Sequence, residues 1–144
     1  MNKEDIPPIT SDIYIILSCY NEEETLEEVV TGLVERGFKV IIVDDGSKDN
    51  SPVIARQLVK KFNPNVYHYR HIINVGLGGA IKTGIRAALS KGADIMITFD
   101  ADGQHNPDDL YNIYPPLQEG KADVVIAARD FEDMPTGRRF GNTV

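Results

Sequence analysis

Short apolar runs alternate with amphipathic stretches along the chain. Continuous apolar runs at residues 13–17 and 40–43 predict strands that are buried on both faces. Shorter runs at 66–69, 95–99 and 124–128 predict three further strands. After each of the first four runs, apolar residues recur three and four positions apart, which indicates an amphipathic helix. The pattern therefore predicts five strands separated by four helices.

Local signals indicate where the helices begin and end. Asn21 with Glu24 three residues later resembles a capping box, and Gly37 suits the position after the last turn of that helix. Ser51 and Asn106 each precede a proline, which the first turn of a helix tolerates. The third helix is predicted over residues 78–91. The residues expected on its inward face are Ile81, Ile85, Ala88 and Leu89.

Repeated strand–helix alternation predicts an α/β domain with a mostly parallel sheet and helices on both faces. Residues 13–129 are predicted to form this domain, after an N-terminal extension at 1–12 and before a mobile tail or lid loop at 130–144. Ligands of such sheets bind beyond the carboxyl ends of the strands, where the strand order reverses. The segments that follow the predicted strands are residues 18–22, 44–47, 74–79, 100–105 and Arg129.

Composition and charge exclude several classes of protein. The 144 residues contain 15 Lys and Arg against 22 Asp and Glu, and this net charge of −7 argues against a general nucleic-acid binder. The single cysteine, Cys19, cannot form an internal disulfide, and we expect it to be a small buried residue rather than a nucleophile. No apolar run reaches the roughly 18 residues of a spanning helix, and residues 1–12 do not resemble a signal peptide, so a cytoplasmic location is expected.

Carboxylates follow two of the predicted strands. Asp44 and Asp45 come after the second strand, and Asp44 alone is equally typical of a turn. The fourth strand leads into Asp100-Ala101-Asp102-Gly103-Gln104-His105, which offers two carboxylates, an amide and an imidazole within six residues. Hard cations prefer oxygen ligands of this kind, so the segment predicts a site for Mg²⁺ or Mn²⁺.

A glycine-rich stretch at residues 74–83 resembles a phosphate-binding loop but departs from it at one position. Ile81 stands where the P-loop pattern requires its second glycine, and the third glycine of a dinucleotide fingerprint is also missing. We therefore expect these glycines to let the helix start pack close to the sheet or to a ligand. Tyr20 could stack on a nucleobase or be a generic aromatic, and His68 and His71 are expected to be structural.

Four motifs together resemble family 2 of the inverting glycosyltransferases. They are Ser18-Cys19-Tyr20-Asn21-Glu22, Val43-Asp44-Asp45-Gly46-Ser47, Asn74-x-Gly76-x-Gly78 and the segment from Asp100 to His105. The last motif most resembles dolichyl-phosphate mannose synthases and related polyprenyl-phosphate glycosyltransferases. The resemblance covers residues 13–129, and the four motifs in order are more specific than any one alone.

This resemblance implies a GT-A (Rossmann-like) fold, a nucleotide-sugar donor of GDP-mannose or UDP-glucose type, and Mg²⁺ or Mn²⁺ as cofactor. By position, the donor would contact Tyr20, Glu22, Val43, Asp45, Asp100, Ala101 and Asp102. The metal would be held by Asp100, Asp102 and Gln104, and the residues carrying catalysis would be Asp100, Asp102 and Arg129. Arg138 and Arg139 would approach the donor phosphates as part of the lid.

The expected reaction is single displacement with inversion, which transfers the sugar to dolichyl or polyprenyl phosphate at the cytosolic face of the membrane. Ser18 stands where the family usually has proline, and the chain ends at Val144, before the acceptor-binding segments of the family. We therefore expect a C-terminally truncated, donor-binding half, with peripheral membrane contact made by the part beyond it.

Two alternatives remain open at this stage. A sugar-phosphate nucleotidyltransferase would need a basic, glycine-rich loop after the first strand, whereas residues 18–22 are acidic. A non-catalytic nucleotide-sugar-binding module is the other alternative, and the complete set of Asp100, Asp102 and Gln104 argues against it.

Overall fold

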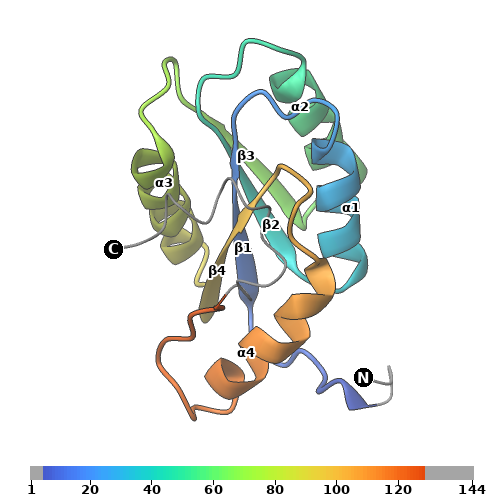
Figure 1. Ribbon diagram of the computed structural model, residues 1–144, viewed down its shortest axis with the longest axis vertical. Coiled ribbons are helices and arrows are strands. Elements are labelled where there is room, and N and C mark those ends of the chain that lie inside the picture. Colours follow the sequence, from blue (N-terminus) through green and yellow to red (C-terminus); the bar gives the residue numbers. More distant parts are fainter. Residues whose placement is uncertain (1–4, 129–144) are drawn as a thin grey trace, which may run out of the picture.

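The structure, a computed structural model, describes residues 5–128 as four strands and four α-helices in strict alternation (Figure 1). The elements are β1 (Ile13–Cys19), α1 (Leu26–Glu35), β2 (Lys39–Asp44), α2 (Ser51–Lys61), β3 (Val66–Arg70), α3 (Leu77–Ser90), β4 (Ile95–Asp100) and α4 (Leu110–Gln118). A short 3-10 helix, Pro107–Asp109, leads into α4. The first four predicted strands and all four predicted helices are thereby confirmed.

The strands form one parallel sheet in the order β3-β2-β1-β4. Helices α1, α2 and α4 pack on one face of this sheet and α3 packs on the other (Figure 1). The chain moves outward from β1 to β3 and then returns to place β4 on the other side of β1. The strand order therefore reverses between β1 and β4, which is where a ligand is expected in a sheet of this kind.

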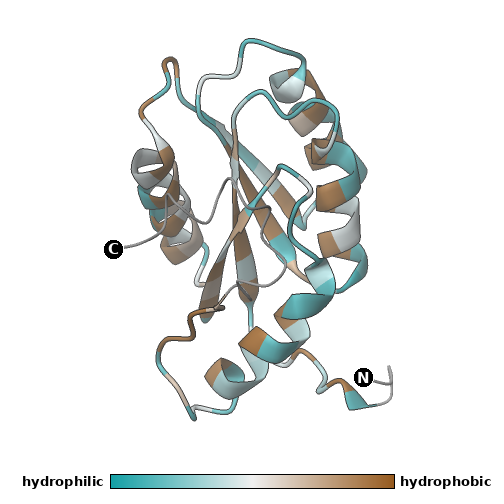
Figure 2. Cartoon of the chain, in the orientation of Figure 1, coloured by the Kyte–Doolittle hydropathy of each residue, from teal (hydrophilic) through white to brown (hydrophobic). Residues whose placement is uncertain are grey.

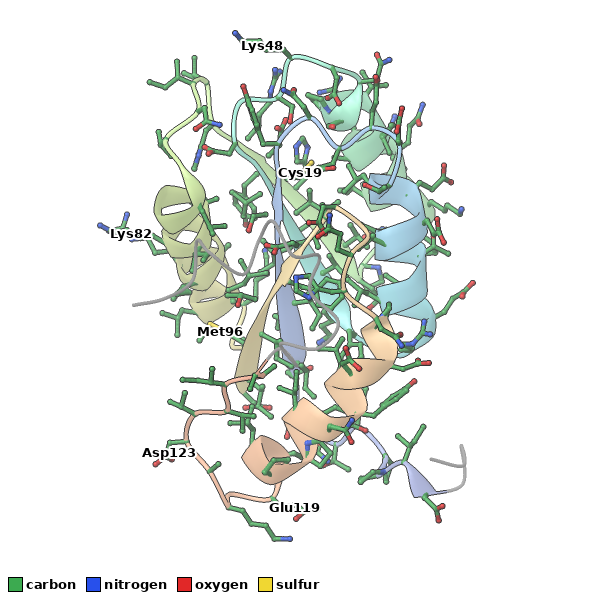
Figure 3. The ribbon with its side chains drawn as sticks, in the orientation of Figure 1. Cys19, Lys48, Lys82, Met96, Glu119 and Asp123 are labelled. Atoms are coloured by element: carbon green, nitrogen blue, oxygen red, sulfur yellow. The ribbon has the colours of Figure 1, made fainter. Side chains whose placement is uncertain are left out.

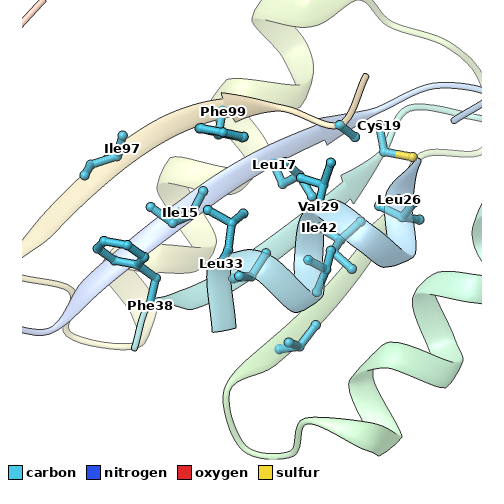
Figure 4. Packing of buried hydrophobic residues seen from close by; sticks show 14 of the residues in the cluster. Ile15, Leu17, Cys19, Leu26, Val29, Leu33, Phe38, Ile42, Ile97 and Phe99 are labelled. Carbon is cyan, nitrogen blue, oxygen red and sulfur yellow. The ribbon is translucent and has the colours of Figure 1, made fainter. Parts of the chain in front are cut away.

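The larger core lies between the sheet and helices α1, α2 and α4. Ile15, Leu17 and Ile42 point from the strands toward Leu26 and Leu33 of α1, and all five are completely buried (Figure 4). The apolar stretches of the strands are the brown ribbons at the centre of Figure 2. Burial of each such side chain contributes about 1.5–3 kcal/mol, so this face supplies most of the driving force for folding.

The second core, beneath α3, depends on small residues rather than on large ones. Its buried positions are Ala80, Gly84, Ala87 and Ala88. A Cβ atom built on Gly84 would lie 2.2 Å from Cγ2 of Ile16, so the helix backbone rests almost directly on β1. The prediction that Ile85 and Leu89 face inward is wrong, since they are 37% and 60% exposed. The small residues allow the close approach, and the large ones are left outside.

The start of α1 differs from the prediction. The helix begins at Leu26 with Thr25 as N-cap and without a capping hydrogen bond from a side chain. Asn21 instead has a positive φ of 53° and belongs to the preceding loop. The expected end is confirmed, because Gly37 has a φ of 90° and its N–H donates to the carbonyl of Val34.

The fifth predicted strand is absent from residues 124–128, which are irregular. Val124 and Ile126 are 75% and 86% exposed. A cavity of about 850 Å³ lies between this segment and β4, so the two backbones do not pair. An apolar run forms a strand only when its backbone bonds to a neighbouring strand, and over residues 5–128 the outer edge of β4 stays unpaired.

The N-terminal segment packs against α4 rather than extending away from the domain. The hydroxyl of Tyr114 donates to the carbonyl of Pro7, and the side-chain amide of Gln118 donates to that of Pro8 over 2.9 Å. Ile9 contacts the larger core. Residues 7–12 are therefore part of the folded unit. Over the range 5–128, no helix is both long and apolar enough to cross a membrane.

Candidate active site

The carboxyl ends of β1 and β4 lie side by side. Ser18 is paired with Asp100, and the N–H of Ala101 donates to the carbonyl of Ser18 over 3.3 Å. The hydroxyl of Thr25 donates to the carbonyl of Ala101 over 2.6 Å, which ties the end of the β1–α1 loop to the end of β4. The two acidic motifs of the sequence therefore meet at the point where the strand order reverses.

Three carboxylates, those of Glu22, Asp100 and Asp102, gather at this point. Burial, followed by the negative charges of Asp102, Asp49 and Asp100, raises the pKa of Glu22 above its ordinary value. In the part of the chain that the structure describes, neither Glu22 nor Asp102 forms an ion pair with Lys or Arg. This concentration of negative charge is electrostatically unfavourable by itself and would be relieved by a cation.

The segment after β4 fixes the orientation of two of these carboxylates. Nε2 of His105 lies 3.1 Å from Oδ2 of Asp100, and its ring packs against Phe99 with centroids 5.3 Å apart. Oδ1 of Asp102 accepts the N–H of Gln104 over 2.9 Å, at a turn where Gly103 has a φ of 74°. Both interactions hold acidic side chains at the rim of the sheet.

The donor atoms present fit a hard divalent cation. Carboxylate oxygens from Asp100 and Asp102 and the amide oxygen of Gln104 are the ligand types that Mg²⁺ and Mn²⁺ prefer. Within residues 5–128, however, no three His, Cys, Asp or Glu side chains are already close enough together to hold a metal ion. The geometry therefore brings the predicted ligands into one neighbourhood and leaves their coordination a prediction.

The β1–α1 loop and the β2–α2 loop are joined by reciprocal hydrogen bonds. The N–H groups of Asn21 and Glu22 donate to the hydroxyls of Ser47 and Ser51, each over 2.9 Å. In return, the N–H of Lys48 donates to Oδ1 of Asn21 over 2.8 Å. This explains why Asn21 does not cap α1, because its side chain is used between the loops. The two loops form one rigid wall beside the acidic group.

Asp45 supports the loop between β3 and α3. Its side chain is almost completely buried and accepts the N–H groups of Val75 and Gly76 at 2.9 and 2.8 Å. Nδ1 of His71 lies 2.8 Å from the same carboxylate, and Nε2 of His71 lies 2.8 Å from the hydroxyl of Thr83. The carboxylate of Asp45 already has three partners within the protein, and its contact with the donor stays a prediction.

His71 has the structural role expected of it, and Thr83 is a member of this group that sequence reasoning missed. The parallel pairing of β2 with β3 places Asp44 opposite Arg70, so the next residues on each strand, Asp45 and His71, become neighbours. Strand order was the signal needed to find this contact. Thr83 has no comparable signal, since it reaches the group from the second turn of α3.

Asp45 should make folding stability depend on pH below the ordinary carboxyl range. Burial alone would raise the pKa of Asp45, but hydrogen bonds from Val75, His71 and Gly76 together lower it below 3.8. A depressed pKa means that the stabilisation is present at neutral pH and is lost as the pH falls through the folded-state pKa.

Denaturant unfolding of the wild type and of Asp45→Asn between neutral pH and pH 3 would test this. The difference in free energy of unfolding between the two proteins should shrink as the solution is acidified. A difference that stays constant over that range would contradict the role of the carboxylate charge. The exposed variant Asp123→Asn is the control and should leave the pH dependence unchanged.

Asp44 has the turn role that was one of its two interpretations. Its side chain is fully buried, and Oδ1 accepts the N–H of Ser47 over 2.9 Å. Nε of Arg70 lies 3.3 Å from Oδ2 and compensates the buried charge. His68 lies close by, and burial lowers the pKa of its imidazole, which favours the neutral form. Asp44 therefore shapes the β2–α2 loop and does not belong to the acidic group at β4.

The remaining predicted site residues differ in accessibility. Tyr20, two residues before Glu22 in the β1–α1 loop, is 42% exposed and accessible to a ligand. The side chains of Val43 and Ala101 are buried in the cores and offer no exposed surface. Burial raises the pKa of Cys19 to about 11, which agrees with the expected inert cysteine. Arg129, Arg138, Arg139 and the predicted lid at 130–144 lie outside the described residues.

Comparison with known proteins identifies relatives over nearly the whole chain. The family model described as glycosyl transferase family 2 matches residues 14–143. A UDP-N-acetylglucosamine–dolichyl-phosphate N-acetylglucosaminyltransferase of Methanococcus voltae is 38% identical over 90% of this chain. A polyprenol monophosphomannose synthase of Mycolicibacterium smegmatis is 31% identical over 83%. The chain spans 59% and 46% of the lengths of these two relatives.

Solved structures show the same arrangement of strands and helices. One is a mannosyltransferase of Pyrobaculum calidifontis in complex with GDP-Man and Mn²⁺, with a TM-score of 0.59 and 23% sequence identity. The match covers 75% of this chain and 33% of the mannosyltransferase chain. Another is TarS of S. aureus, residues 1–349 in complex with UDP, with a TM-score of 0.64 and 20% sequence identity. This match covers 87% of this chain and 38% of the TarS chain. At these identities the likeness concerns the fold, and it confirms the predicted GT-A class.

Proposed function

This chain belongs to glycosyl transferase family 2, and on that premise we propose that it forms the donor-binding part of an inverting glycosyltransferase. The donor is a nucleotide sugar, and the acceptor of the whole enzyme is a dolichyl or polyprenyl phosphate. The relatives from Methanococcus and Mycolicibacterium carry names of this activity, which supports the acceptor class. The reaction would take place at the cytosolic face of the membrane.

The observation that carries the proposal is the group of Glu22, Asp100 and Asp102 at the reversal of strand order. A nucleotidyltransferase would place basic residues and glycines after β1, whereas this chain places Glu22 there. The exposed ring of Tyr20 stands next to that position, where it could stack on a base. An acidic rim beside an exposed aromatic suits a nucleoside diphosphate that arrives with a divalent cation.

Asp100, Asp102 and Gln104 would hold Mg²⁺ or Mn²⁺, and the bound cation would neutralise the diphosphate leaving group. In this chain, the hydrogen bonds from His105 to Asp100 and from Gln104 to Asp102 orient the carboxylates before the donor arrives. The reciprocal bonds between the β1–α1 and β2–α2 loops hold Tyr20 and Glu22 in place. Arg129, beyond the described residues, is proposed to face the same phosphates.

The chemical step is a single displacement. An oxygen of the acceptor phosphate attacks the anomeric carbon, and the bond from that carbon to the nucleoside diphosphate breaks as the new bond forms. The leaving group keeps the bonding electron pair, and the configuration at the anomeric carbon is inverted. Because the acceptor phosphate is already ionised at neutral pH, no proton has to be removed from it, and this chain needs no general base.

A calorimetric titration with GDP-mannose, UDP-glucose and UDP-N-acetylglucosamine in the presence of Mn²⁺ tests the donor site. We expect one of these donors to bind and Tyr20→Ala to weaken its binding about tenfold, because stacking on a base contributes roughly 1–3 kcal/mol. Tyr20→Phe keeps the ring and should bind like the wild type. Absence of binding by all three donors would refute the proposal, and equal affinity for Tyr20→Ala would remove the stacking role.

A further inference from the structure

The loop between β3 and α3, residues 71–76, and the first residue of α3 expose several large apolar side chains. Ile72 is 99% exposed and Ile73 is 69% exposed, and Val75 and Leu77 follow at 52% and 58%. This loop projects beyond the carboxyl end of the sheet, above α3, and its tip is brown in Figure 2. Single exposed apolar residues are common on soluble proteins, but four within six positions are not explained by packing inside the domain.

The loop is held in place rather than free to collapse onto the core. Asp45 accepts the N–H groups of Val75 and Gly76, and His71 links Asp45 to Thr83. These bonds fix the base of the loop while the Ile72–Ile73 tip stays in solvent. The protein therefore presents the apolar tip at a defined position beside the proposed donor site.

The outer face of α3 continues this surface with basic and apolar residues. Ile85 and Leu89 are exposed, and Lys82 and Arg86 lie on the same side of the helix. Figure 3 shows Lys82 pointing away from the sheet. We refer to the exposed residues Ile72, Ile73, Val75, Leu77, Lys82, Ile85, Arg86 and Leu89 as the loop–α3 surface.

Charge is distributed very unevenly along the chain, and this surface lies in its basic part. Residues 71–91, which form the loop and α3, contain three Lys and Arg and no Asp or Glu, although the whole chain has a net charge of −7. Asp44 and Asp45, at the nearby end of β2, are buried and paired within the protein. The loop–α3 surface is thus a basic and apolar region on an otherwise acidic protein.

We propose that the loop–α3 surface docks on an anionic phospholipid bilayer, with Ile72 and Ile73 inserted among the acyl chains and Lys82 and Arg86 facing the headgroups. Apolar insertion combined with attraction to anionic lipid is how amphipathic surfaces bind membranes. A nucleic acid would not require exposed isoleucines, and a symmetric dimer through this surface would bring the like charges of Lys82 and Arg86 together. The proposal rests on the proposed function for its purpose, which is to bring the donor site to an acceptor embedded in the membrane.

Co-sedimentation of the 144-residue chain with vesicles tests the proposal. We expect the chain to bind vesicles containing phosphatidylglycerol and to bind pure phosphatidylcholine vesicles much more weakly. Ile72→Ser/Ile73→Ser should reduce partitioning by about tenfold or more, because each buried Ile side chain favours the apolar phase by at least that factor. Lys82→Gln/Arg86→Gln should reduce it by about tenfold or more on anionic vesicles only, since each charge contributes roughly fivefold.

Val124→Ser/Ile126→Ser is the matched control, because these side chains are equally exposed but lie outside the surface. It should partition like the wild type. Wild-type binding that is absent, or that persists in the Ile72→Ser/Ile73→Ser variant, would overturn the proposal. Sedimentation velocity checks for a second copy on the same surface. If the Ile72→Ser/Ile73→Ser variant stopped self-associating but bound vesicles as before, the surface would belong to a second copy and the proposal would be overturned.

Nucleotide titration of the same proteins separates this proposal from the proposed function. The Ile72→Ser/Ile73→Ser variant should bind the nucleotide-sugar donor as the wild type does while losing the vesicles. A wild type that binds vesicles but no nucleotide sugar would refute the donor site and leave the docking surface standing. A wild type that binds the donor but no anionic vesicle would refute the docking surface and leave the donor site standing.

Discussion

Replacing Asp102 with Asn should lower the affinity for a nucleoside diphosphate about 100-fold in the presence of Mn²⁺, because even residues that only support metal ligands contribute 10–100-fold to metal binding. EDTA should lower the affinity of the wild type to a similar level and should have little further effect on the variant. The fold should remain intact, because the side-chain oxygen of Asn can still accept the N–H of Gln104 that Asp102 accepts. Calorimetry with UDP and GDP measures the affinity, and thermal unfolding measures the stability.

The control for this variant is Asp123→Asn, which removes the same charge from an exposed position in the segment after α4 (Figure 3). It should bind nucleotide and metal like the wild type. Thermodynamic linkage adds a second measurement, because the nucleotide must raise the affinity for Mn²⁺ by the same factor by which Mn²⁺ raises the affinity for nucleotide. Nucleotide binding that is equally strong in EDTA and in Mn²⁺ would exclude a metal role for Asp102.

Gly84→Ala should destabilise the protein by about 1–3 kcal/mol or more, although alanine is the better helix former. The added Cβ would lie 2.2 Å from Cγ2 of Ile16 and 3.2 Å from two further atoms of that side chain. Ile16 is completely buried in the centre of the sheet, so neither it nor the backbone of α3 can move without disturbing the core. Denaturant unfolding would show the effect as a lower midpoint with an unchanged slope.

Gly78→Ala, in the same helix, is the matched control. An added Cβ at Gly78 would meet nothing within 4 Å, so the substitution should stabilise the protein by up to about 1 kcal/mol through helix propensity alone. The two glycine-to-alanine changes are therefore expected to act in opposite directions. Stabilisation by both would contradict the close packing of α3 on β1 at Gly84.

The strands β1 and β2 could be predicted from the sequence because their apolar runs are buried on both faces and leave no other interpretation. The face of α3 could not, since hydrophobicity favours large residues inside, whereas the contact at Gly84 excludes them. The run at 124–128 has the composition of a strand, but pairing depends on a neighbour that composition does not reveal. The glycines at 74–79 were expected to approach the sheet or a ligand. Gly76 and Gly78 leave open space around them, and the close contact of α3 with the sheet lies at Gly84.

The alternation of strands and helices predicted which loops share one edge of the sheet, and the segments after β1 and β4 do lie side by side there. It could not distinguish the roles of Asp44 and Asp45, which differ only in which way each side chain points from the end of β2. Asp44 turns toward the N–H of Ser47, and Asp45 turns toward the loop before α3. Nor could local spacing show that Asn21 bonds to Lys48 in another loop instead of capping α1.

The bonds between the β1–α1 and β2–α2 loops have a consequence for building chimeras from relatives of this protein. The N–H groups of Asn21 and Glu22 depend on the hydroxyls of Ser47 and Ser51, and Lys48 depends on Asn21. A graft that replaced residues 44–51 alone could remove the two hydroxyls that accept these N–H groups, at about 1–3 kcal/mol for each one buried. A graft that replaced residues 20–25 alone could remove the side-chain oxygen of Asn21 that accepts the N–H of Lys48. Donor specificity should therefore be transplanted with both loops together, as a single cassette that includes residues 44–51.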